Sequence, residues 1–221
     1  MRSAASVLLV PFIALLVSAC ARGPSEAQLR PPDEWRGVLS DTARAWGDRA
    51  AAASRGLAER RAPEAAWPAL AQAIRFSRSQ ALASDPQPIP DEIQRTLAPY
   101  FDAAVLSRTR WTLADRRLGL GSLLAGWYYE EGAVTLDDVV VFSDHAMVVN
   151  VWLWAHELAH VEQYRRRGID RFAFDYITDW RALEAEANAR AFAVTADIRA
   201  RRSAAQPSLP AIGGDEAEAA P

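Results

Sequence analysis

The clearest hydrophobic pattern in this chain runs from residue 150 to residue 168. Its first half is apolar at nearly every position. A helix that is apolar on all sides is buried, and polar side chains within it need partners. Asn150 suits a helix N-cap, the arginines at 165–167 suit the negative end of the helix dipole, and Gly168 suits the residue after the last turn. The pattern predicts a buried helix over 150–167.

Apolar residues at helical spacing predict further helices on both sides of this one. We expect helices over 33–61, 64–82, 91–97 and 170–177, and a long one from Trp180 to about Arg201 that Thr178 or Asp179 would cap. Short β-branched and aromatic runs between residues 103 and 142 predict a small sheet of about three strands. The expected fold is α+β and predominantly helical, with the sheet directly before the buried helix.

Length and composition indicate one domain of moderate size. The chain has 221 residues, half of them hydrophobic, and a net charge of −3. That charge gives no indication of nucleic-acid binding, so we expect no nucleic-acid partner. A proline-rich break at 84–90 and a stretch rich in alanine and proline after residue 202 divide the chain. The predicted parts are a helical region over 33–83, a second domain over 91–202 that contains the buried helix, and a disordered tail over 203–221.

The first twenty residues predict export. A short basic start, an apolar run and small residues are typical of a signal peptide, here over 1–19. Val17-Ser18-Ala19-Cys20 resembles a bacterial lipobox, which implies lipidation of Cys20 and anchoring on the periplasmic face of an envelope membrane. The alternative is ordinary secretion, with cleavage at the small residues around Cys20. Residues 20–32 would then form a tether.

The polar residues of the buried helix form the motif H-E-x-x-H, at His156, Glu157 and His160. Residues four apart lie on one helix face, so the two histidines could bind one zinc ion. Zinc lowers the pKa of its bound water to roughly 7, and Glu157 could act as the general base on that water. The alternative is a buried helix whose histidines only form hydrogen bonds. His145, in the turn before the helix, is a weaker candidate that could simply be exposed.

A catalytic zinc site needs a third protein ligand and one position for water. The long helix after the motif offers Glu184 and Glu186, and the residues alone leave both open. A peptidase also needs a group that stabilises the oxyanion. Tyr164, one turn beyond His160, and Tyr176 are candidates, although a buried tyrosine is usually a core residue.

Together these motifs resemble those of the gluzincin group of zinc peptidases, in which H-E-x-x-H is followed by E-x-x-[AS]-[DN]. The stretch Glu184-Ala185-Glu186-Ala187-Asn188 matches this form. The resemblance implies that Glu184 binds zinc, that Asn188 orients a ligand histidine, and that Glu186 is the less favoured ligand.

Residues 100–192 also resemble the metallopeptidase domain named the core domain of extracellular contractile injection systems. The likeness lies in Gly-Ala-Val-Thr-Leu from Gly132, His-Glu-Leu-Ala-His-Val-Glu-Gln-Tyr over 156–164, and the E-x-E-A helix. It covers less than half of the chain. It implies a zincin-like arrangement, with a second ligand-bearing helix after the first.

The sequence thus predicts a zinc-dependent metallopeptidase that hydrolyses peptide bonds of a peptide or protein substrate in the bacterial cell envelope. A sheet edge beside the site could bind an extended peptide by strand addition. One alternative is a non-catalytic zinc-binding envelope lipoprotein, which would act as a scaffold or binding module. Another is a helical lipoprotein without a metal.

Overall fold

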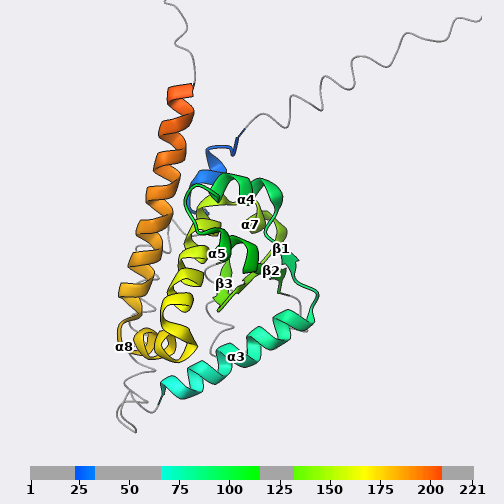
Figure 1. The fold of residues 1–221 in the computed structure, drawn as a ribbon, viewed down its shortest axis with the longest axis vertical. Coiled ribbons are helices and arrows are strands. Elements are labelled where there is room, and N and C mark those ends of the chain that lie inside the picture. The colour runs from blue at the N-terminus through cyan, green and yellow to red at the C-terminus, as the bar shows by residue number, and fades with distance from the viewer. Residues whose placement is uncertain (1–22, 33–65, 115–131, 206–221) are drawn as a thin grey trace, which may run out of the picture.

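The computed structural model describes residues 23–32, 66–114 and 132–205. The elements, in chain order, are η1 (Ala27–Leu29), α3 (Trp67–Ala83), β1 (Gln87–Pro88), α4 (Asp91–Leu97), α5 (Ala103–Arg108), β2 (Arg110–Leu113), β3 (Ala133–Leu136), β4 (Val139–Phe142), α7 (His145–Val148) and α8 (Val151–Ala205). The predicted α+β, predominantly helical fold is confirmed (Figure 1). Within the described residues, no helix combines the length and apolar character needed to cross a bilayer.

Several predictions concern residues outside the described ranges. These are the signal peptide, Cys20, the helix over 33–61, the part of the predicted sheet region at 115–131 and the tail from residue 206 onward. The tail was predicted to begin at residue 203, but residues 203–205 are helical, because α8 continues to Ala205 instead of ending at about Arg201. Alanines at the end of α8 have the highest helix propensity of any residue, which favours these additional positions.

Helix α8 consists of three helical segments that two residues with non-helical backbone separate. Gly168 has φ 72° and ψ 164°, and Asp179 has φ −154° and ψ 66°. The segments therefore cover 151–167, 169–178 and 180–205, as the sequence predicted to within a few residues. The chain turns back across the middle segment, so the third segment returns beside the first (Figure 1).

The predicted helix caps are present. Asn150 Oδ1 accepts a hydrogen bond from the Leu153 amide at 2.8 Å, and Asp179 Oδ1 accepts one from the Ala182 amide at 3.3 Å. A side-chain oxygen at this position satisfies an amide that has no partner within the helix. The positive φ of Gly168 is readily available only to glycine, which confirms its predicted place at the helix end.

The sheet has four strands in the order β1-β2-β4-β3, rather than about three. β3 and β4 are antiparallel, β4 and β2 are parallel, and β2 and β1 are antiparallel. The additional strand, β1, has only two residues and lies in the proline-rich break. Two residues are too few to show strand periodicity, and Pro88 is tolerated there because β1 is an edge strand.

The two central strands separate two hydrophobic clusters. Every residue of β3 and β4 is buried. On one face Val140 and Phe142 pack in a cluster with Trp154 of α8. On the other face Val139 and Val141 join residues from α3, including Ile74, and from the later part of α8. Helix α3, predicted to belong to an N-terminal helical region, therefore shares a core with the sheet and α8.

Candidate metal centre

Two segments of α8 bring the predicted ligands together. His156 and His160 lie one turn apart in the first segment, and their Nε2 atoms are 3.0 Å apart. Glu184, from the third segment, places Oε2 3.4 Å from His156 Nε2 and 3.5 Å from His160 Nε2. One candidate ligand atom from each residue lies within 4.8 Å of the others. These three residues form a group that could hold a metal ion.

The chemistry of this group suits a metal with three protein ligands. The two histidine side chains are buried, and the Glu184 side chain is 13% exposed. Two imidazole nitrogens and one carboxylate oxygen are a donor set found in catalytic zinc sites. The bends at Gly168 and Asp179 make this possible, since they return the third segment to the face that carries the histidines.

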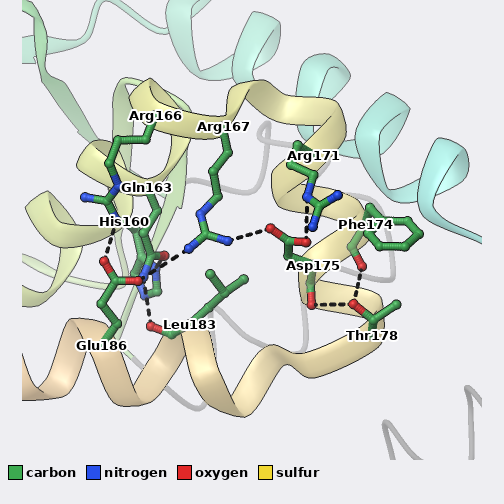
Figure 2. A network of polar contacts seen from close by, with 10 residues as sticks. All are labelled: His160, Gln163, Arg166, Arg167, Arg171, Phe174, Asp175, Thr178, Leu183 and Glu186. Carbon is green, nitrogen blue, oxygen red and sulfur yellow. Dashed lines mark hydrogen bonds and ion pairs between the residues drawn. The ribbon is translucent and has the colours of Figure 1, made fainter.

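Gln163 fixes the orientation of His160. His160 Nδ1 lies 2.9 Å from Gln163 Oε1, and Gln163 Nε2 donates to the Leu183 carbonyl at 2.9 Å (Figure 2). Because the amide nitrogen of Gln163 is committed to Leu183, its oxygen accepts from Nδ1–H of His160. The Nε2 lone pair of His160 is then directed at the ligand group. Sequence reasoning did not identify Gln163, although its position three residues after His160 places it on a neighbouring part of the helix surface.

Without a metal, the ligands form a buried ion pair. Burial disfavours the charged form of His160, but the carboxylate of Glu184 outweighs burial and raises the pKa of His160 to about 10. Burial likewise disfavours the charged Glu184, but His160 and His156 outweigh it and lower the pKa of Glu184 well below its usual range. A proton on His160 therefore occupies the position where a metal would bind.

Glu157 is buried beside this group and accepts a hydrogen bond from a residue of the sheet. Its side chain is only 2% exposed. The Thr135 hydroxyl donates to Glu157 Oε2 at 2.6 Å, and it also lies 3.2 Å from the carbonyl oxygen of Glu157. Thr135 belongs to β3, on the strand face that looks toward α8. Thr135 was not predicted from the sequence, because this contact joins residues that are 22 positions apart.

A small cavity of about 30 Å³ opens between β3 and the candidate ligands. Glu157, His160 and Glu184 line it, together with Tyr164 and Tyr176. This volume exceeds what one buried water needs, and the lining offers several polar partners. The cavity thus places a water-sized space next to a carboxylate and to two of the candidate ligands.

Both candidate tyrosines line the cavity, but their contacts differ. Tyr176 donates a long hydrogen bond of 3.4 Å to Glu184 Oε1, whereas Oε2 is the oxygen that pairs with the histidines. Tyr164 stacks on Phe172, with ring centroids 3.8 Å apart. Burial raises the pKa of the Tyr164 hydroxyl well above 10, so this hydroxyl keeps its proton.

The remaining predicted residues are not all at the site. Glu186 is largely exposed and pairs with Arg166 and Arg167, outside the ligand group (Figure 2). His145 is exposed at the start of α7, and its ring is nearly perpendicular to that of Trp111, with centroids 6.5 Å apart. Asn188 lies one turn beyond Glu184, and its Oδ1 is buried without a hydrogen-bond partner among the described residues.

Comparison with known proteins found no matching family model, no matching curated protein and no matching solved structure. The resemblance to gluzincins and to the injection-system core domain therefore depends on the motif residues alone and stays a prediction.

Proposed function

We propose that this chain is a zinc-dependent metallopeptidase of the bacterial cell envelope. The observation that carries the proposal is the His156–His160–Glu184 group, two of whose members, His160 and Glu184, share a cavity with the buried Glu157. A metal site without catalysis has no need for a buried carboxylate that does not join the ligand set. A buried carboxylate is costly unless hydrogen bonds hold it, and Thr135 supplies one.

Zinc is the metal that this donor set suits best. His156, His160 and Glu184 would hold it, and Asn188, one turn beyond Glu184, would orient a ligand histidine. When bound, the metal would supply Lewis acidity, which lowers the pKa of a bound water to about 7 and polarises the substrate carbonyl.

The residues of the chain supply the proton transfers. Glu157 would accept a proton from the attacking water and deliver it to the amine that leaves when the peptide bond breaks. The hydrogen bond from Thr135 holds the Glu157 carboxylate in one orientation at the cavity wall. Tyr176 and Tyr164 would be available to stabilise the oxyanion, because both line the same cavity.

Strand β3 is the proposed position for an extended substrate. Within the described residues, β3 pairs with β4 on one side only, and Ala133 to Thr135 line the cavity. A peptide that added to this edge would run past Glu157 and the ligand group. The lipobox at Cys20 supports a location at the membrane, where the substrate would be an envelope protein or peptide.

Two measurements test the proposal in order. The first is zinc per purified full chain, beside Glu184→Ala and the matched control Glu186→Ala. We expect about one zinc in the wild type and in Glu186→Ala, and weak or no binding in Glu184→Ala. A folded wild type that binds no zinc, before or after zinc is added, would refute the metal site.

The second measurement is hydrolysis of a mixed peptide library by the zinc-loaded chain, beside Glu157→Gln. We expect cleavage by the wild type and its loss in Glu157→Gln, with zinc retained in both. If the wild type and Glu157→Gln are equally inactive, the chain is a non-catalytic zinc-binding protein.

A further inference from the structure

Residues 23–32, the segment before the domain, pack against α8 and form hydrogen bonds with it. Leu29 of η1 is fully buried in the larger core cluster, and Pro24 and Pro32 are buried as well. In Figure 1, η1 lies beside the end of α8 that is far from the bend at 168–179. Part of the predicted tether over 20–32 therefore packs against the domain, which restricts how far the domain can move from its anchor.

Two arginines near the end of α8 hold this segment. Arg199 donates to Glu26 Oε1 at 2.8 Å and to the Leu29 carbonyl at 2.6 Å. Arg202 donates to the Pro24 carbonyl at 2.5 Å. Bonds to backbone carbonyls fix the path of the chain itself, so the segment keeps one position against the helix.

The residues directly before α8 hold the other end of the segment. Asn150 Nδ2 donates to the Arg30 carbonyl at 3.0 Å, and Gln28 Nε2 donates to the Val149 carbonyl at 3.0 Å. The segment is therefore tied at one end to α8, the helix that carries all three candidate ligands, and at the other end to the two residues that precede α8.

The distance from Cys20 to this fastened segment is short. Only two residues separate Cys20 from Gly23, and three residue steps span at most about 11 Å of fully extended chain. A lipid on Cys20 would therefore hold the end of α8 close to the bilayer surface.

This end of the domain carries an excess of positive charge. Four arginines gather there, and the acidic partners among the described residues are Glu26 and Asp197, which leaves a net charge of +2 for this set. The arginines are Arg30, Arg199, Arg201 and Arg202. Basic side chains next to a membrane anchor are attracted to anionic lipid headgroups.

We infer that the end of α8 faces the bilayer and that its arginines contact anionic headgroups, so the candidate metal centre is held at a fixed distance from the membrane. The inference rests on the proposed lipid anchor at Cys20. Glu184 precedes Arg199 by 15 positions, which corresponds to about 22 Å along the helix axis. The centre would then act on peptide bonds displaced from the bilayer surface, not on bonds at it.

Energy transfer from two positions of the last helix to the bilayer surface tests this orientation. The full chain is purified in detergent and reconstituted into phosphatidylethanolamine–phosphatidylglycerol vesicles that carry acceptor headgroups. Any free Cys20 thiol is coupled to a maleimide lipid, so attachment does not depend on lipidation by the host. A genetically encoded fluorescent residue replaces either Ser203 or Ala182, two exposed positions about 32 Å apart along the helix.

We expect transfer from position 203 to exceed transfer from position 182 several-fold. The Arg199→Gln variant should reduce this contrast, because it releases Glu26 and the Leu29 carbonyl while the other contacts of the segment remain. The matched control Arg201→Gln removes one charge at the same end but leaves the segment in place, so it should keep the contrast. Equal transfer from both positions in the wild type, or equal contrast in both variants, would overturn the inference.

Vesicles of phosphatidylcholine alone test the headgroup contact. The contrast should be smaller there, and an undiminished contrast would overturn the part assigned to anionic lipid. Acidic residues at 215–218 follow the helix in the sequence, so this comparison also tests whether the arginines are available to lipid. The mass of the chain made in a bacterium reports separately whether Cys20 is lipidated, which tests the proposed anchor and not the orientation.

Discussion

The hydroxyl of Thr135 donates a hydrogen bond to Glu157 Oε2 across 2.6 Å, from strand β3 to the first segment of α8. Both side chains are buried, so bulk solvent does not compete for this contact. A hydrogen bond to a charged group in such a setting is stronger than one between neutral groups. The relationship connects the sheet to the residue that we propose as the general base.

Replacing Thr135 with valine should lower peptide hydrolysis while zinc binding is retained. Valine keeps the shape of threonine but removes the donor, so the Glu157 carboxylate loses its orientation. General bases contribute about 10²–10⁴-fold to rate, and we expect a loss of about tenfold or more in kcat. Thr135→Ser keeps the hydroxyl and should recover most of the rate. A Thr135→Val variant with wild-type kcat and normal zinc content would contradict this role.

Zinc binding at pH 7 should release a proton from His160. The pKa of His160 is raised to about 10 in the metal-free protein, so the imidazole carries its proton at pH 7, whereas a metal ligand must be neutral. Zinc affinity should therefore rise as the pH rises toward 10. Titration calorimetry in two buffers of different ionisation enthalpy would count the protons released.

The Glu184→Gln variant is the control for this proton count. Without the Glu184 carboxylate, the pKa of His160 falls and fewer protons should be released per zinc bound. Weaker zinc binding is expected as well, since one ligand is lost. Wild-type zinc binding with no proton release at pH 7 would show that His160 is already neutral and would contradict the ion pair.

Local patterns were sufficient to predict the main parts of the site. The spacing of His156 and His160, the Asn150 cap and the break at Gly168 each depend on residues within a few positions of one another. Helix geometry alone relates such residues. Local spacing alone does not place Glu184 at the site, because its position beside the histidines depends on how the chain bends between residues 168 and 179.

Contacts between distant parts of the chain were not predictable in the same way. The hydrogen bonds of Thr135 to Glu157 and of Gln163 to Leu183 join residues 22 and 20 positions apart. The segment at 23–32 was predicted as a tether from its polar, proline-containing composition, but the structure fastens it to α8, where Arg30 and Asn150 are 120 positions apart. Composition describes a segment by itself, whereas these contacts depend on which surface it meets.

Replacing Gln163 with leucine should weaken zinc binding. Leucine is of similar size but cannot hydrogen-bond to His160 or to the Leu183 carbonyl. Removing a group that orients a metal ligand typically costs about 10–100-fold in metal affinity. The neighbouring Glu162→Gln is the matched control, because Glu162 pairs with Arg190 and does not contact the ligands. Competition with a chromophoric chelator would measure both affinities, and equal values would contradict a supporting role for Gln163.

Asn150 should contribute to stability through both ends of its side chain. Its Oδ1 caps the helix at the Leu153 amide, and its Nδ2 holds the Arg30 carbonyl. Asn150→Ala removes both contacts, and loss of a cap alone costs about 1–2 kcal/mol in the free energy of unfolding. Asn150→Asp keeps the oxygen that caps the helix and loses only the donor to Arg30, so it should be destabilised less than Asn150→Ala. Urea unfolding of the three proteins would measure the difference, and an Asn150→Ala variant as stable as the wild type would show that neither contact matters.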